Sequence, residues 1–400
     1  MVQLPIMTHL DHRLHEHLQS LDAQGLLRSI VQTKPLAKGR IEVEGKQYLN
    51  LSGNDYLGLG SDAALLREFY ANLTSDNDCR LFALGSGASR LMTGSSAAYQ
   101  QLEDSLARLY GKERALVFNS GWQLNTGVLS AIIRKDDFVL ADRLCHASLI
   151  DGLRLTGAKV IRYPHLDYEK LEKLLRQHCG PSRMVFIVTE SIFSMDGDCA
   201  DLPALAALRH KYGAVLYVDE AHAVGVRGER GLGLAEEQDV LDQIDLLIGT
   251  FGKALAGQGA FVVGSRLLCD FLVNTARSLI FTTALPPICI HWLNFVLQKI
   301  VTMTDERLRL TELADQLRTR LHQLGLVTGG SSQIVPVMIG DSAQAVAVAE
   351  QLQGQGWWVN AVRPPTVPPN TARLRLSLSA TMNSTQLDGL PEQILARIKP

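Results

Sequence analysis

The sequence predicts an α/β protein whose mainly parallel sheet is covered by helices on both faces. From residue 100 onward, short apolar runs alternate with segments of helical spacing. Strands separated by helices favour parallel pairing, because each return to the same sheet needs a crossover. After residue 287 a long helical stretch is followed by short strands and helices, a pattern typical of a smaller α+β domain.

Each element of the large domain has its own signal. The first helix, "QQLEDSLARLYG", ends on a glycine, and further helices are expected in "YEKLEKLLRQH" and "LPALAALRHKYG". Between them we expect strands at "ALVF", "DFVLADR", "KVIRYP", "MVFIVTES", "AVLYVDEAH", "LLI" and "AFVV". In the small domain, "DERLRLTELADQLRTRLHQLG" predicts a long helix, and the proline-rich residues 363–370 predict an ordered loop between two strands. We therefore expect an N-terminal helical segment (1–47), a large domain (48–297) and a small C-terminal domain (298–400).

Composition excludes several classes of protein. The 400 residues are 46% hydrophobic and 20% charged, and 39 Lys and Arg against 41 Asp and Glu give a net charge of -2. This balance predicts no nucleic-acid partner and no membrane association. The most apolar long segment, "ALPPICIHWLNFVLQKIV", is interrupted by prolines and polar residues.

The six cysteines are scattered and form no C-x-x-C pair, so neither a metal site nor a dithiol site is expected. The N-terminus lacks the apolar core of a signal peptide. Together these features predict a cytoplasmic protein.

Polar residues follow several predicted strands, where open α/β sheets bind their ligands. "FNSGWQLN" would present the backbone N–H groups of Ser120, Gly121 and Trp122 to an anion, although for this tripeptide taken alone an ordinary strand-to-helix turn is the better explanation. "VDEAH" and "TESIFSMDGD" carry further carboxylates and hydroxyls, but taken singly they also fit a helix cap and a turn.

The decisive residue is Lys253, which lies among glycines between two apolar strands. A loop lysine is usually a solvated surface charge. A lysine held among buried strands loses solvation, its pKa falls and its amine becomes a nucleophile suited to a Schiff base. With an anion site at Gly121, Asp219 for a pyridinium nitrogen and His146 to stack on a ring, this arrangement predicts pyridoxal phosphate as cofactor.

Two rival phosphate motifs are incomplete. "GSGASR" lacks the third glycine of a dinucleotide fingerprint, and "GTFGKA" lacks the Walker spacing and the hydroxyl after its lysine.

The sequence resembles the α-oxoamine synthases, a branch of the fold-type-I pyridoxal phosphate enzymes. The resemblance covers nearly the whole chain and rests on seven ordered segments: "YLNLSGNDYLGL", "GSGASRLMTG", "LVFNSGWQLN", "DRLCHASLIDG", "TESIFSMDGD", "VDEAHAVGVRGERGLG" and "GTFGKALAG". It implies the fold-type-I architecture and a homodimer with shared active sites.

The resemblance also implies a role for each matching residue. It assigns catalysis to Lys253, which forms the Schiff base, and to His146, Asp219 and His222. The residues expected to bind the cofactor are Lys253, Gly121, Trp122, His146, Ser194, Asp219, His222, Thr250 and, from the other subunit, Thr283. The residues expected to bind substrate are Arg28, Asn54, His146, Thr366 and Arg375. Departures from the family pattern are Trp122, Cys145 and Gln258.

Within the family, "VRPPTVPPNTARLRLSLSA" resembles the branch that condenses L-alanine with a pimeloyl thioester in biotin biosynthesis. The alternative is a sister activity that joins glycine to acetyl-CoA. A non-catalytic regulator would carry a DNA-binding module before this fold, but only about fifty residues, not markedly basic, precede the first match. A structural protein with a surface lysine would bind no cofactor.

Overall fold

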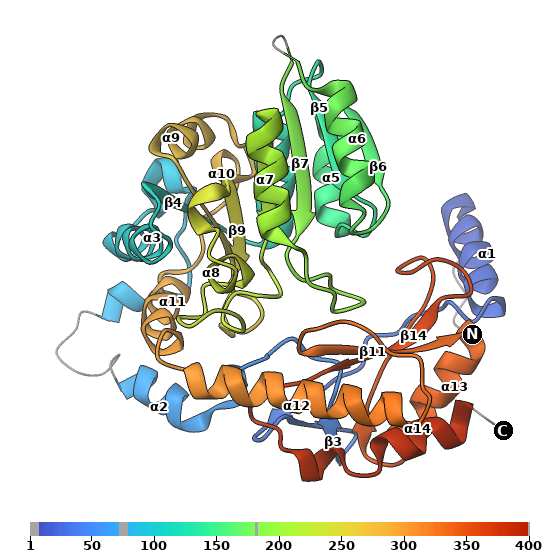
Figure 1. Ribbon diagram of the computed structural model, residues 1–400. Helices are drawn as coiled ribbons and strands as arrows, with labels where there is room; N and C mark the ends of the chain where they lie inside the picture. The colour runs from blue at the N-terminus through green and yellow to red at the C-terminus, as the bar shows by residue number, and fades with distance from the viewer. Residues whose placement is uncertain (1–7, 72–78, 181–182, 399–400) are drawn as a thin grey trace.

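The computed structural model describes residues 8–71, 79–180 and 183–398 (Figure 1). The large unit is built on a seven-stranded sheet with the order β4-β10-β9-β8-β7-β5-β6. Its strands are β4 Arg114–Phe118, β5 Phe138–Asp142, β6 Lys159–Tyr163, β7 Val185–Glu190, β8 Val215–Asp219, β9 Leu246–Thr250 and β10 Ala260–Gly264. Strand β10 is antiparallel to both neighbours, and all the other pairs are parallel. The predicted fold class is confirmed.

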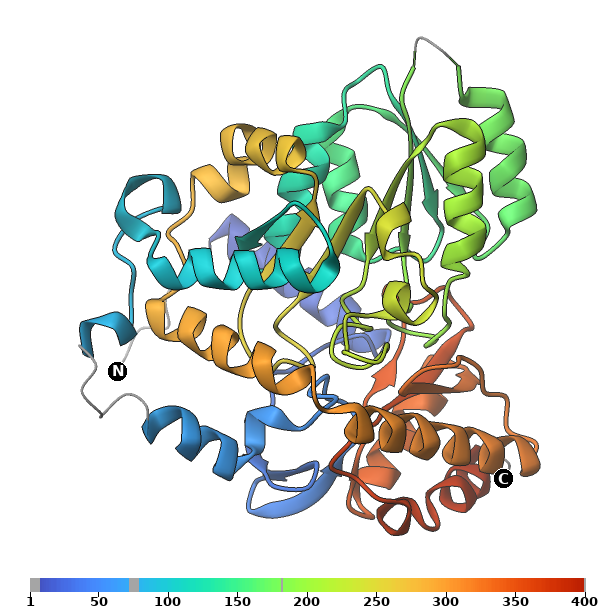
Figure 2. The ribbon, with the colours of Figure 1, turned by 60° about the vertical axis from the view of Figure 1, so that its left-hand side comes forward.

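Helices cover both faces because the strands are apolar on both sides. In β4, Val117 faces one buried cluster while Leu116 and Phe118 face the other. Helices on the first face are α3 Ala97–Tyr110, α6 Tyr168–His178, α7 Leu202–Tyr212 and α11 Pro287–Ile300. Helices on the second face are α4 Gly121–Ile132, α5 Ala147–Thr156, α9 Arg266–Thr275 and α10 Arg277–Ile280. The view in Figure 2 shows α3 and α11 lying in front of the sheet.

The smaller unit combines the two ends of the chain. Its three-stranded antiparallel sheet has the order β11-β14-β13, formed by β11 Ile334–Gly340, β13 Ala361–Val362 and β14 Ala372–Ser377. A second sheet has the order β1-β2-β3-β12, formed by β1 Lys34–Leu36, β2 Arg40–Val43, β3 Lys46–Asn50 and β12 Trp357–Trp358. Helices α12 Thr304–Gln323, α13 Ser342–Gln353 and α14 Leu390–Ile398 complete the unit.

The N-terminal region differs from the predicted helical segment. Residues 1–7 lie outside the described residues, α1 spans His9–Ala23, and residues 34–50 form three strands. Strand β3 pairs in parallel with β12, more than 300 residues later, so residues 34–50 belong to a sheet that the C-terminal region completes. Helix α2 Ala63–Ala71 follows. The large and small units separate at residues 301–303 between α11 and α12, and we propose this break as the boundary in place of residue 297.

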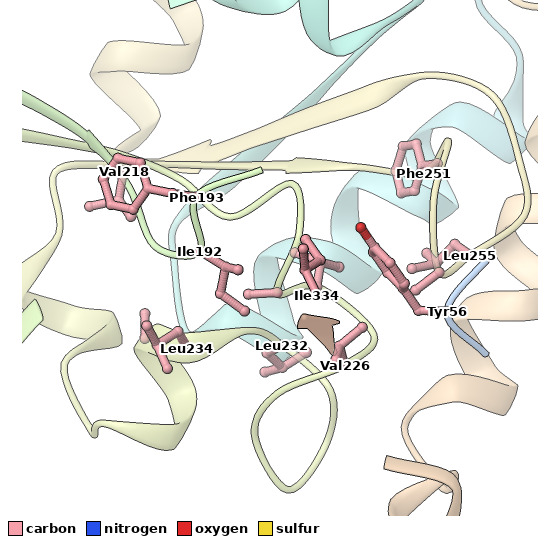
Figure 3. Packing of buried hydrophobic residues seen from close by; sticks show 14 of the residues in the cluster. Tyr56, Ile192, Phe193, Val218, Val226, Leu232, Leu234, Phe251, Leu255 and Ile334 are labelled. Atoms are coloured by element: carbon pink, nitrogen blue, oxygen red, sulfur yellow. The ribbon is translucent and has the colours of Figure 1, made fainter. Parts of the chain in front are cut away.

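The two units share one hydrophobic cluster. Figure 3 shows Tyr56 and Ile334 among side chains of the large unit such as Ile192 and Phe251, and all four are buried.

Gly197 lies in the predicted "SMDGD" turn with a φ of 69°, and a Cβ there would approach the Ile334 carbonyl oxygen to 2.2 Å. Only glycine therefore allows this turn to lie against β11.

Among the described residues, no helix has the length and apolar composition needed to cross a membrane. The five cysteines whose side chains are described are all free.

Candidate active site

The carboxyl ends of the central strands bring the predicted polar residues together. Asp219 ends β8 directly opposite Glu190, which ends β7, and Thr250 ends the neighbouring β9. The Glu220 N–H, just beyond β8, donates to the Ile248 carbonyl at 2.8 Å. This edge of the sheet is where parallel α/β proteins place their ligands.

Lys253 reaches this edge from the loop between the antiparallel strands β9 and β10. The loop is closed by backbone bonds from Phe251 N–H to Gly259 O at 3.0 Å and from Gly257 N–H to Phe251 O at 2.9 Å. Gly259 has a φ of 110°, and a Cβ there would lie 2.9 Å from the Phe118 carbonyl. Gly259 thus allows the loop to fold tightly against the sheet.

The Lys253 amine is not a solvated surface charge. Its Nζ lies 2.9 Å from Nε2 of His222, a buried residue. Burial lowers the pKa of Lys253 to about 8, against the opposing attraction of Asp219 and Glu190. The same burial, with Lys253 nearby, holds the pKa of His222 well below its usual value, so the imidazole is neutral.

A chain of side chains leads from His222 into the small unit. The Tyr56 hydroxyl lies 2.6 Å from His222 Nδ1 and 3.0 Å from Asn54 Oδ1. Arg375 of β14 donates from Nη2 to Asn54 Oδ1 at 3.1 Å, and from Nε to the Ser194 carbonyl at 2.5 Å. Residues from both units thus place a guanidinium close to the lysine.

A second network surrounds Asp219, which is buried at the end of β8. Its Oδ1 accepts from the Ala221 N–H at 2.9 Å, and its Oδ2 accepts from Asn125 Nδ2 at 2.8 Å. Asn125 also donates to the Ser148 hydroxyl at 2.9 Å, and that hydroxyl lies 2.8 Å from Nδ1 of His146.

A third group lies at the start of α4, which follows β4. Ser120 caps this helix by accepting from the Gln123 N–H at 3.2 Å, and Gly121 is its first residue. A Cβ at Gly121 would meet nothing within 4 Å except the Thr250 hydroxyl at 3.9 Å. Space therefore remains beside a helix N-terminus, next to the Thr250 hydroxyl, which here donates to the Gly259 carbonyl at 3.1 Å. A helix N-terminus with free N–H groups is suited to a phosphate.

Trp122 is 48% exposed, and its ring meets the His146 ring edge to face with centroids 6.1 Å apart. His146 is exposed on part of its surface, yet loss of solvation against its neighbours lowers its pKa. Ser194 is buried, and its backbone oxygen holds Arg375.

Three predicted residues make no contact with the lysine within the described part of the chain. Arg28 and Thr366 are exposed and line a groove of about 780 Å³ between residues 22–33 and 346–366, which also includes Met195, the neighbour of Ser194. Thr283 is exposed, and its carbonyl accepts from Asn119 Nδ2 at 2.6 Å. Within the described residues no hydrogen bond or ion pair joins these three side chains to Lys253, so the roles that the resemblance implies for them stay predictions.

Several residues of the site had no predicted role. Asn125, Ser148 and Tyr217 form a buried network beside Asp219, and Glu190 accepts from the His146 N–H at 2.5 Å. Burial, reinforced by Asp219, raises the pKa of Glu190 to about 8. All four occur within or beside the motifs at the strand ends, but only the folded structure shows that they converge.

Comparison with known proteins decides the family. A family model described as aminotransferase class I and II matches residues 46–394. The chain belongs to this family. Within it, the chain is 49% identical over 381 residues to 8-amino-7-oxononanoate synthase of Chlorobaculum parvum, covering 94% of this chain and 97% of that enzyme.

Solved structures similar to this chain have the same fold. A serine palmitoyltransferase from S. paucimobilis, solved with bound PLP and myriocin, superposes with a TM-score of 0.88 at 29% identity and covers 98% of both chains. The 8-amino-7-oxononanoate synthase of Francisella tularensis gives a TM-score of 0.76 at 27% identity over 88% of this chain and 98% of that one.

Pyridoxal phosphate, the cofactor of family members, fits the residues present. The site offers an amine of lowered pKa, a buried carboxylate for a ring nitrogen, and an open helix N-terminus with a hydroxyl for a phosphate.

The lowered pKa of Lys253 can be measured directly. In cofactor-free protein, we expect the amine to react with trinitrobenzenesulfonate along a pH curve with its midpoint near 8, because only the neutral amine attacks and its fraction rises as pH passes the pKa. Lys211 is the internal control, since its bond to Glu172 raises its pKa and delays labelling to higher pH. Peptide mapping by mass spectrometry gives both curves.

Glu190, with its own pKa raised to about 8, ionises over the same pH range as the amine, and its charge then favours the protonated amine. Replacing Glu190 by Gln removes that charge, so the Lys253 midpoint moves to lower pH. Equal midpoints for Lys253 and Lys211 would contradict the burial of the amine.

Proposed function

We propose that this protein is a pyridoxal phosphate-dependent acyltransferase that condenses L-alanine with a pimeloyl thioester. The products are 8-amino-7-oxononanoate, CO2 and the free thiol, a step of biotin biosynthesis. The observation that carries the proposal is the 49% identity, across 94% of this chain and 97% of the other, to an enzyme with that name.

Bound pyridoxal phosphate supplies an aldehyde and an electron-withdrawing ring that stabilises negative charge at the α-carbon of an amino acid. Lys253 holds the cofactor through its amine. The buried Asp219 carboxylate keeps the ring nitrogen protonated, and neutral His222 donates a hydrogen bond to the ring oxygen. Ser194 contacts the cofactor, and His146 stacks on its ring. The N–H groups of Gly121 and Trp122, with the Thr250 hydroxyl, bind the phosphate.

Lys253 also moves the proton of the reaction. As a free amine beside the bound amino acid, it would remove the α-proton of alanine and later return a proton to that carbon. A pKa of about 8 suits this double role, because both protonation states are populated close to neutral pH.

Arg375 binds the carboxylate of the amino acid. It already donates to Asn54 and to the Ser194 carbonyl, which fix the plane of the guanidinium. A fixed guanidinium holds a carboxylate bidentately. Asn54 lies beside this position through its bond to Arg375, and we expect Asn54 and His146 to contact the same substrate.

The acyl thioester enters along the groove lined by Arg28 and Thr366. The groove of about 780 Å³ has an apolar part, formed by residues such as Val346 and Ala349, and a cation, Arg28, at its exposed side. The apolar lining suits an acyl chain, and the Arg28 cation suits a negatively charged group on that chain.

We further propose that the active protein is a homodimer in which Thr283 of each subunit binds the phosphate at the other site. Thr283 is exposed here, close to Phe281, which is 71% exposed. An apolar side chain so exposed fits a surface that a second copy covers. The cytoplasmic location stays a prediction.

A direct assay tests the proposed substrates. Purified enzyme is incubated with L-alanine, glycine or L-serine, each with pimeloyl-CoA, acetyl-CoA or palmitoyl-CoA, and thiol release and product mass are recorded. We expect turnover with alanine and pimeloyl-CoA at least about tenfold above every other pair, since one methylene or methyl group in a fitted pocket changes selectivity by roughly 10–200-fold. Preferred use of glycine with acetyl-CoA would instead identify the sister activity.

A further inference from the structure

Asn125 lies in the second turn of α4 and is 2% exposed. Both N–H groups and the oxygen of its side-chain amide form hydrogen bonds. Its Nδ2 donates to Asp219 Oδ2 at 2.8 Å and to the Ser148 hydroxyl at 2.9 Å, and its Oδ1 accepts from the Tyr217 hydroxyl at 2.6 Å. We propose that Asn125 is a positioning residue that orders the protons between Asp219 and His146, so that His146 stays a neutral hydrogen-bond donor at Nε2. Its catalytic consequence rests on the proposed function, but the protonation pattern itself does not.

The direction of the first bonds follows from Asp219. Both of its oxygens accept from N–H groups, Oδ1 from Ala221 and Oδ2 from Asn125, as an ionised carboxylate does. The NH2 group of Asn125 must therefore face Asp219, and its oxygen must face Tyr217. Tyr217 is completely buried and donates its only hydroxyl proton to that oxygen.

The second NH of Asn125 then fixes the Ser148 hydroxyl, which is itself 2% exposed. Because this oxygen already accepts from Asn125, its own proton is free to be donated, and its neighbour at 2.8 Å is Nδ1 of His146. Each group thus donates a hydrogen bond to the next, from Tyr217 through Asn125 and Ser148 to the imidazole. Nδ1 is the acceptor at the end of this chain.

The start of α5 leads independently to the same result. His146 is the N-cap residue, and its Nδ1 accepts the Ser148 backbone N–H at 3.2 Å. The His146 N–H is held by Glu190 at 2.5 Å, which fixes the backbone that carries the ring. A proton on Nδ1 would oppose both donors. The proton of the neutral ring therefore sits on Nε2, which has no partner among the described residues and is free to donate to a substrate oxygen.

The charged groups around His146 have opposite signs. Asp219 favours the imidazolium, Lys253 opposes it, and loss of solvation is the largest influence and lowers the pKa of His146. Glu190 lies on the backbone side and Trp122, which is uncharged, covers part of the ring. A hydrogen bond donated to Nδ1 stabilises the neutral form further.

Histidine ring 15N NMR of the holoenzyme, without substrate, tests the proposal, with His146 assigned by comparison with His146→Gln. We expect Nδ1 at the position of an unprotonated nitrogen and Nε2 at that of a protonated one near pH 7.5. In Asn125→Asp, Asn125→Ala and Ser148→Ala we expect the His146 titration midpoint to rise by about one pH unit, because each removes or redirects a hydrogen bond to the neutral ring.

Ser130→Ala is the matched control, since this α4 hydroxyl bonds only to backbone oxygens of its own helix. The Asn125→Ala, Ser148→Ala double variant should shift the midpoint no further than the larger single change, because both act on one chain of bonds. A protonated Nδ1 in the parent, or unchanged midpoints in the folded variants, would overturn the proposal. Should Asn125→Ala fail to fold, the shape-matched Asn125→Asp and Ser148→Ala decide. Failure of the alanine and pimeloyl-CoA assay would leave these spectra unaffected.

Discussion

Lys253→Ala should lose turnover by at least roughly 10⁴-fold, because the variant lacks both the amine that holds the cofactor and the base that moves the substrate proton. Alanine cannot replace either function, and the neighbouring imidazole of His222 is buried and neutral. A second readout does not depend on turnover. In the parent, borohydride should fix the cofactor to the peptide that contains residue 253, and in the variant this peptide should keep its unmodified mass.

The matched control is Lys211→Ala, which removes an exposed lysine from the end of α7. It should retain parental turnover and cofactor attachment. Parental turnover in Lys253→Ala, or cofactor attached to a different lysine, would remove Lys253 from the mechanism.

Asp219→Asn should lower kcat by roughly 10²–10³-fold, the usual cost of removing one preorganised electrostatic group at a reacting centre. The amide carries no charge to balance a protonated ring nitrogen. It also cannot accept at both positions, since Oδ1 and Oδ2 each receive an N–H, so one donor would face the new NH2 group. We therefore expect weaker cofactor binding as well, measurable as a lower cofactor content after dialysis.

Asp270→Asn provides the comparison, because this carboxylate is 52% exposed and pairs with Arg114 on the outer side of the large unit. It should leave kcat and cofactor content unchanged. Circular dichroism and thermal unfolding separate misfolding of Asp219→Asn from a loss of chemistry. Parental kinetics in a folded Asp219→Asn would exclude the carboxylate from the reaction.

The central sheet could be predicted from the sequence because each of its strands is a short apolar run that ends at polar or glycine residues. Runs such as 185–190 are buried on both faces, so their hydrophobicity is continuous and easily recognised. The antiparallel strand β10 could not be distinguished from its parallel neighbours, since direction depends on the tight loop at Gly259 rather than on composition.

The N-terminal strands could not be predicted for a different reason. Lys46–Asn50 is largely polar and exposed, with Leu49 as its single buried side chain. Its structure depends on pairing with Trp357–Trp358, a contact across the length of the chain that no local pattern encodes.

Residues near Lys253 could be predicted from the sequence, because a lysine among glycines and a carboxylate at the end of a strand are unusual patterns. Asn125 and Ser148 are ordinary helix residues in the sequence, and their importance comes from facing Asp219 and His146 in space. Conversely, Arg28 and Thr366 carry roles from the resemblance alone, because within the described residues neither contacts the lysine, although both line one groove.

The pairing of β3 with β12 has a consequence for how the chain is made. During synthesis β3 is made before its outer neighbour β12, which follows more than 300 residues later. The edge of β3 must wait, unpaired, while the entire large unit is translated and folds. Final assembly of the small unit therefore requires residues 357–358, and deleting them should leave one edge of β3 without its partner.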